Sequence, residues 1–142
     1  RPALIIHDGT RFHLTAPPIT RASNTLGADV ALNNTGTYFT GPTVAQGTSG
    51  IWFAAGSVVV KDTAGVATFN ARLTDGTTTV ASGRSTSSAA NSLVTIHLSG
   101  FFSSPAGNIR ITVNDQSSTS GAMVFNDSGN GTDSQIWAFR VA

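Results

Sequence analysis

The chain has 142 residues, no cysteine, 11% charged residues and a formal net charge of +1. This length allows one domain with a single core, while the missing cysteines exclude disulfides, thiolate metal sites and a cysteine nucleophile. The seven arginines are scattered singly, so no basic stripe offers itself to nucleic acid, and no apolar run approaches the ~20 residues that span a bilayer.

The N-terminal segment predicts a small unit of its own. The stretch ALIIHDGTRFHLT, residues 3–15, alternates in the manner of a hairpin around Asp8-Gly9. Two prolines then interrupt the alternation, and residues 16–27 predict an extended connector. We therefore expect residues 1–28 to form an N-terminal hairpin and connector, the remnant of a stem or collar, and residues 29–142 to form the main domain.

From residue 29 onward, apolar residues recur with period two between turns rich in Gly, Asn, Asp and Ser. The stretch 50–62 has two apolar faces, which predicts a strand covered on both sides. Later strands predict one inward face each: Phe69, Ala71 and Leu73; Val94, Ile96 and Leu98; Ile109, Ile111 and Val113. Eight or nine strands without a helix predict an all-β, antiparallel jelly-roll (Greek-key) sandwich, with an immunoglobulin-like sandwich as the alternative.

The search for reactive groups identifies no reaction. No Gly-x-Ser-x-Gly turn is present, and the three histidines, His7, His13 and His97, are interpreted as hairpin or surface residues. Asp8 and Asp75 each precede a glycine and are explained by turn chemistry. That leaves NDSGNGTD as the one loop where acidic and amide residues could converge: Asp127, Asn130 and Asp133. Glycines occupy positions where a calcium loop needs ligands, so we expect no metal and no cofactor, and interpret the loop as a contact for a glycan or a receptor.

The aromatic residues predict an interface. Tyr38 and Phe39 are adjacent in the sequence, as are Phe101 and Phe102. Neighbouring residues of a strand face opposite sides, so they cannot all enter one core. Together with the apolar C-terminal stretch, this predicts a subunit interface that includes Tyr38, Phe39, Trp137 and Phe139.

The stretch ALNNTGTYFTGPTVAQGTSGIWFAAGSVVVKDTAGVATFNARLTDG and the terminal SQIWAFRVA resemble the trimeric jelly rolls of the tumour necrosis factor (TNF) and complement globular-head superfamily. The versions at the tips of bacteriophage tail needles and fibres are the most similar in texture. The resemblance implies a last strand near a threefold axis, where neighbouring subunits or the core would bury Trp137 and Phe139.

These observations favour a non-enzymatic, trimeric knob of a phage-type appendage, located on the virion or outside the cell. We expect it to attach to a glycan or protein of a bacterial surface, or to cap a fibre. One alternative is a monomeric carbohydrate-binding or lectin-like module that stacks Tyr38, Trp52 or Trp137 on sugars. Others are a capsid or neck decoration and, least favoured, a hydrolase at Asp127 and Asp133.

Overall fold

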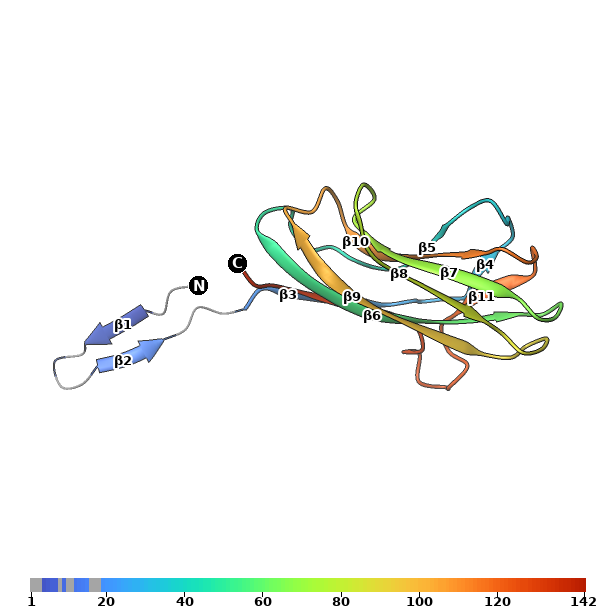
Figure 1. Cartoon of the computed structure of the whole chain (residues 1–142). Helices are drawn as coiled ribbons and strands as arrows, with labels where there is room; N and C mark the ends of the chain where they lie inside the picture. Colours follow the sequence, from blue (N-terminus) through green and yellow to red (C-terminus); the bar gives the residue numbers. More distant parts are fainter. Residues whose placement is uncertain (1–3, 8, 10–11, 16–18) are drawn as a thin grey trace.

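A computed structural model describes residues 4–7, 9, 12–15 and 19–142 of the chain. The described residues contain strands and turns, and none of them lies in a helix that is long and apolar enough to cross a membrane. Strands β1 (Leu4–His7) and β2 (Phe12–Thr15) form a two-stranded antiparallel sheet. The other ten strands form two sheets that pack face to face as a sandwich (Figure 1).

One sheet of the sandwich has four antiparallel strands in the order β5–β10–β7–β8. These strands span Phe39–Val44, Ile109–Asp115, Thr68–Thr74 and Thr79–Thr86. β7 and β8 form a hairpin in which Thr74 faces Thr79. The turn therefore uses four residues, 75–78, and Asp75 and Gly76 are its first two.

The other sheet is built around β6 (Ile51–Asp62), the longest strand. One edge of β6 pairs along its length with β9 (Val94–Ser103). The opposite edge pairs first with β12 (Gln135–Arg140) and then with β11 (Gly121–Val124). Beyond them lie β3 (Arg21–Thr25) and β4 (Val30–Leu32).

The predicted jelly-roll sandwich is confirmed, because consecutive strands cross repeatedly between the two antiparallel sheets. The inward residues predicted for the stretches around β7 and β10 are all fully buried, and Ile96 and Leu98 of β9 are also in the core. Val94 packs against the edge of the core and keeps some exposure. Period two therefore places the core correctly.

Two expectations need correction. β3 lies within the predicted connector, yet it pairs with β12 from Arg21↔Phe139 to Thr25↔Gln135, so the sandwich begins well before residue 29. β6 was expected to be covered on both faces. Trp52, Ala54, Val58 and Val60 are buried between the sheets, whereas Ile51 on the other face is exposed.

Candidate functional site

Four aromatic side chains meet on the outer face of the six-stranded sheet. We call Phe53, Phe101, Trp137 and Phe139 the aromatic patch. The ring of Phe53 is its centre, with centroid distances of 5.0 Å to Phe101, 5.8 Å to Trp137 and 5.5 Å to Phe139. Trp137 and Phe139 lie nearly parallel, 5.8 Å apart and tilted by 6°. These are favourable distances for aromatic pairs.

The register of the sheet creates this cluster. Phe53 of β6 faces Phe101 of β9 on one side and Phe139 of β12 on the other. Trp137 is two residues from Phe139 and therefore on the same face of β12. Three strands far apart in sequence thus place four rings on one surface.

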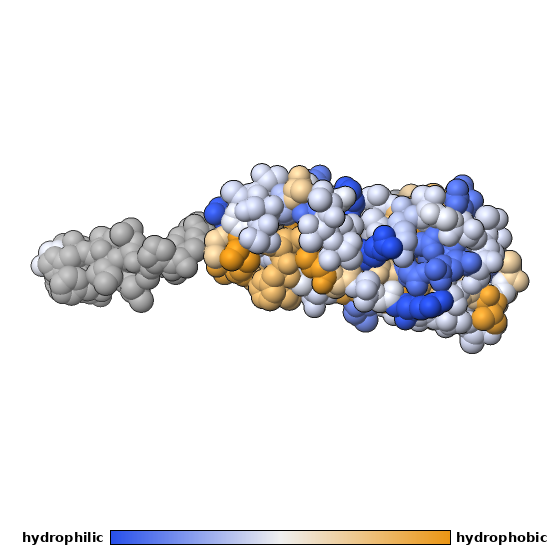
Figure 2. All heavy atoms as spheres, turned by 45° about the horizontal axis from the view of Figure 1, so that its top comes forward, coloured by the Kyte–Doolittle hydropathy of each residue, from blue (hydrophilic) through white to orange (hydrophobic). Residues whose placement is uncertain are grey.

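Much of the patch is open to solvent: Phe101 is 61% exposed and Trp137 is 41% exposed. Ile19, Ile51 and Val141, which are also exposed, lie at the same end of the sheet. Apolar atoms accordingly reach the surface at the end of the sandwich where β3 begins (Figure 2). Exposed apolar residues that gather in this way mark a contact surface.

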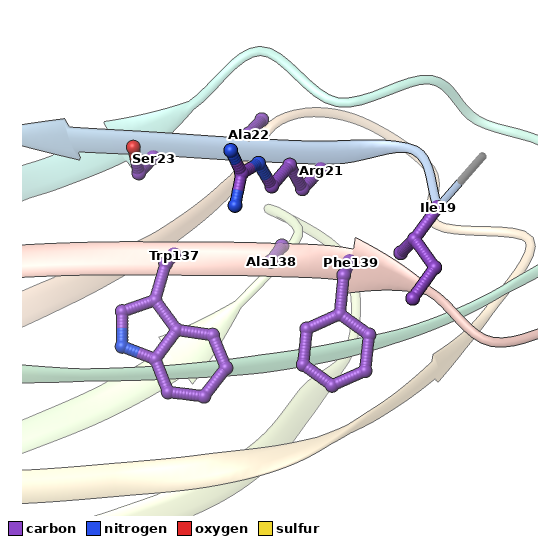
Figure 3. A pocket seen from close by; sticks show the side chains of 7 residues that line it. All are labelled: Ile19, Arg21, Ala22, Ser23, Trp137, Ala138 and Phe139. Carbon is purple, nitrogen blue, oxygen red and sulfur yellow. The ribbon is translucent and has the colours of Figure 1, made fainter.

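A hollow of about 980 Å³ adjoins the patch along β3 and β12. In Figure 3 the rings of Trp137 and Phe139 project to the same side of β12, and Ile19 extends beside Phe139. Arg21 and Ser23 line the hollow from β3 and are its polar residues. Its character is therefore mainly apolar and aromatic, with one cationic side chain at the border.

The structure separates the four residues that were predicted to form one interface. Trp137 and Phe139 belong to the aromatic patch. Phe39 begins β5 in the other sheet, where it packs partly against the core. Tyr38 precedes it and lies under the Arg72 guanidinium, 3.7 Å from the ring centroid. Tyr38 and Phe39 therefore lie in a different part of the molecule from Trp137 and Phe139.

Sequence reasoning did not select Phe53 and Phe101 as site residues, although both carried a signal. The adjacent pairs Trp52-Phe53 and Phe101-Phe102 each had to place one ring on the outer face. What the sequence lacked was the register that sets Phe53 opposite Phe101. Trp52 is the inward member of its pair and is 3% exposed, which removes it as a sugar-stacking residue.

The predicted receptor loop connects β11 to β12 and leaves the six-stranded sheet on the side away from the four-stranded sheet (Figure 1). Asp127 and Asn130 are exposed. The carboxylate of Asp133 instead accepts hydrogen bonds from the backbone N–H (2.9 Å) and the hydroxyl of Ser128, which lower its pKa. Asp133 thus holds the loop in shape, and the backbone N–H of Asp127 also donates to its carboxylate.

The described residues contain no group of three or more His or Asp side chains placed to hold a metal ion. His97 is exposed on the outer face of β9, opposite Ser57. The side chains of His7, His13 and Asp8 lie outside the described residues. The arrangement that the structure does provide is an open aromatic surface suited to binding another apolar or flat surface.

Neither a protein-family model nor a curated protein sequence matches this chain. Among solved structures, a TNF protein, Eiger from S. frugiperda, is similar in fold. The TM-score is 0.53 at 10% sequence identity, over 89% of this chain and 94% of that chain. At this identity the likeness concerns the fold alone, and the chain has a TNF-like jelly-roll fold.

Proposed function

We propose that this chain is the head of a non-enzymatic, homotrimeric appendage of phage type. Three copies assemble through the aromatic patch, and the trimer attaches to a bacterial surface or caps a fibre. The observation that carries the proposal is the aromatic patch itself, with Phe101 61% exposed on the outer face of a TNF-like sheet. Fully burying one such side chain contributes ~1.5–3 kcal/mol, so several copies would stabilise an assembly strongly.

The path of the chain supports a head carried on a stem. The backbone N–H of Arg140 donates to the Thr20 carbonyl at 2.8 Å, just before β3 begins. The N-terminal part of the chain therefore joins the sandwich beside Phe139. An assembly formed through the patch would bring three such N-terminal segments together at one end, as a fibre requires.

The residue composition fits an external attachment protein. Only 11% of the residues are charged, and hydroxyl and amide side chains fill the loops. Such groups suit contacts with glycans, and three weak sites on one trimer would act together through multivalency. The loop with Asp127 and Asn130 remains the proposed contact for a glycan or a receptor.

The first test is the absolute mass of the chain in solution, measured by light scattering after size-exclusion chromatography. We expect three times the 14.5 kDa chain mass. Phe101→Ser should lower the mass to that of one chain. Val66 is 62% exposed but lies on the loop after β6, at the opposite end of that strand from Phe53, so Val66→Ser should stay trimeric and is the matched control.

A monomer at micromolar concentration would contradict the trimer and favour a second function. The parallel rings of Trp137 and Phe139, beside a hollow lined by Ser23 and Arg21, could stack on a sugar. A glycan array would then identify a ligand for the wild-type chain, and binding should disappear in Trp137→Ala. If the chain binds cells in its trimeric form but not as a monomer, this second function is excluded.

A further inference from the structure

Two buried aspartates face each other across the end of the sandwich that lies opposite the aromatic patch. Asp62 ends β6 in the six-stranded sheet and is 1% exposed. Asp115 ends β10 in the four-stranded sheet and is 0% exposed. Asp62 lies opposite Gly121 of β11 in the sheet, and Oδ2 of Asp115 packs against Gly121, so the two carboxyl groups are neighbours. They therefore form a contact between the two sheets.

Backbone and hydroxyl donors satisfy three of the four carboxyl oxygens. Oδ1 of Asp115 accepts the N–H groups of Ser117 (2.8 Å) and Ser118 (3.3 Å). Oδ1 of Asp62 accepts the N–H of Ala64 (2.5 Å), and its Oδ2 accepts the hydroxyl of Ser118. Oδ2 of Asp115 is buried without any donor. A buried acceptor without a donor lowers the stability of the fold unless another group donates a hydrogen bond to it.

The space around this oxygen is made by Gly121 of β11. A Cβ atom built on Gly121 would collide with Oδ2 of Asp115 and come within 3.1 Å of its Cγ. The missing side chain therefore admits the carboxyl group.

No cation balances the pair within residues 19–142. Lys61 precedes Asp62 and points to the opposite face of β6. Arg84 of β8 donates to the side chain of Gln116 at 3.0 Å. The loops after β6, after β8 and after β10 contain no charged residue at 63–67, 87–93 or 116–120. Two ionised carboxylates would thus be buried together without compensation.

We propose that Asp62 and Asp115 share one proton, carried on Oδ2 of Asp115 and donated to Asp62, and that this proton fastens the loops at this end of the sandwich. A proton needs one donor and one acceptor, which the pair supplies. A calcium ion needs six to eight oxygen ligands, whereas the pair has four carboxyl oxygens, and three of them already accept hydrogen bonds from the protein.

The loops that depend on the pair are those at residues 63–66 and 116–120. They are joined by the bond from Thr63 N–H to the Ser120 carbonyl at 3.3 Å, and Ser118 Oγ also accepts the N–H of Ser120 at 3.0 Å. Loss of the proton would place two negative charges side by side beneath both loops. We expect the loops to open when the proton leaves for solvent.

The direction of the pH dependence follows from the two aspartates. Burial and the neighbouring Asp62 raise the pKa of Asp115, against the N–H groups of Ser117 and Ser118. Burial opposes ionisation of Asp62 too, but the hydroxyl of Ser118 and its other donors lower the pKa of that carboxyl. The stability supplied by the raised group is present at acid pH and is lost as pH rises through the folded pKa of Asp115.

The test uses the full chain and the Asp115→Asn variant. An asparagine amide can donate to Asp62 at every pH, so the variant should keep its loops while losing this pH dependence. The carboxyl ¹³C signal of Asp115 should titrate above the ordinary aspartate range, and protection of the Ser118 and Ser120 amides, corrected for intrinsic exchange, should fall over the same interval. Asp127→Asn, at an exposed position, is the control and should leave both curves unchanged.

Three outcomes would overturn the proposal. One is titration of Asp115 at or below the ordinary aspartate value in the wild-type chain, which can be measured even if the variant does not fold. Another is equal pH dependence of loop protection in the wild type and Asp115→Asn. The third is an increase in the melting temperature of the wild type, but not of Asp115→Asn, with added Ca²⁺, since the pair would then hold a cation.

Discussion

Trp52 and Phe53 are adjacent in β6 but lie on opposite faces of the six-stranded sheet. Trp52 points between the sheets and donates its indole N–H to the carbonyl of Ser49 at 3.0 Å. Phe53 points outward and contacts three other rings. Two neighbouring aromatic residues therefore have separate purposes, one in the core and one on the proposed assembly surface.

Because Trp52 is in the core and Phe53 is on the outer face, their alanine variants should have different effects. Trp52→Ala should lower the free energy of unfolding by ~3–5 kcal/mol, as expected for truncation of a large buried side chain. Phe53→Ala should change the stability of the isolated chain by only ~0.5–1.5 kcal/mol but should abolish the trimer. Urea denaturation at low protein concentration and light-scattering mass measure the two effects. Trimeric Phe53→Ala protein would contradict the assembly surface.

One serine side chain replaces missing strand-to-strand hydrogen bonds where the loop between β11 and β12 lies beside β6. Ser134 is fully buried; its Oγ accepts the N–H of Val59 at 3.0 Å and donates to the Val124 carbonyl at 2.7 Å. Ser134→Ala would leave both backbone groups without partners. We expect a loss of ~1–3 kcal/mol in the free energy of unfolding, measured by urea denaturation.

The control for this prediction is Ser99→Ala at an exposed position of the neighbouring strand β9. It should change stability by less than ~0.5 kcal/mol. Equal stability of Ser134→Ala and Ser99→Ala would show that solvent or a backbone shift satisfies Val59 and Val124 instead.

Much of the fold could be predicted because alternation is a local property. Phe69, Ala71 and Leu73 alternate with polar neighbours, and this pattern alone places them in the core. The same reasoning failed for residues 21–25, which are polar and follow two prolines. Their pairing with β12 depends on a partner more than 100 residues away, and a pattern within one segment carries no information on such a partner.

The site was harder to predict for the same reason. Trp137 and Phe139 could be selected from their own strand, but the centre of the patch is Phe53, and its neighbours follow from the register among β6, β9 and β12. Asp62 and Asp115 are likewise far apart in the sequence, and no local pattern relates them. Only the packing of the two sheets shows that they are neighbours.

Gly56 of β6 lies directly opposite Ile136 of β12. A Cβ atom at this position would collide with the carbonyl oxygen of Gln135 and come within 3.0 Å of the Cα of Ile136. Because these are backbone atoms, they cannot move aside cheaply. We expect Gly56→Ala to lower the free energy of unfolding by ~1–3 kcal/mol and to disturb the strand that carries Trp137.

Thermal unfolding and light-scattering mass together check this prediction. Gly65→Ala is the matched control, because nothing lies within 4 Å of a Cβ built on Gly65 and its φ is not in the left-handed region. It should leave both quantities unchanged. If Gly56→Ala behaves in the same way, β12 has more freedom to move than its packing indicates.

Asp75 predicts a stability change at acid pH that is opposite in sign to that of Asp115. Burial would raise the pKa of Asp75, but the N–H groups of Thr78, Ala106 and Thr77 donate to its carboxylate at 2.7, 2.8 and 2.9 Å and bring the pKa below its ordinary value. A lowered folded pKa supplies stability that is present above the unfolded value of ~3.9 and is lost as pH falls through the folded pKa. Asp75→Asn would leave one of these donors without an acceptor.

We therefore expect Asp75→Asn to lower the free energy of unfolding by ~1–3 kcal/mol at neutral pH, with a difference from the wild type that narrows below about pH 4, where the unfolded aspartate binds its proton. Melting temperatures between pH 2 and 8 measure this difference, and the exposed Asp127→Asn is the control. Asp115, which shares a proton with Asp62, acts in the opposite direction. The double variant Asp75→Asn/Asp115→Asn should therefore show the weakest overall pH dependence. A difference that stays constant down to pH 2 would mean that the Asp75 turn is held by its backbone and not by its charge.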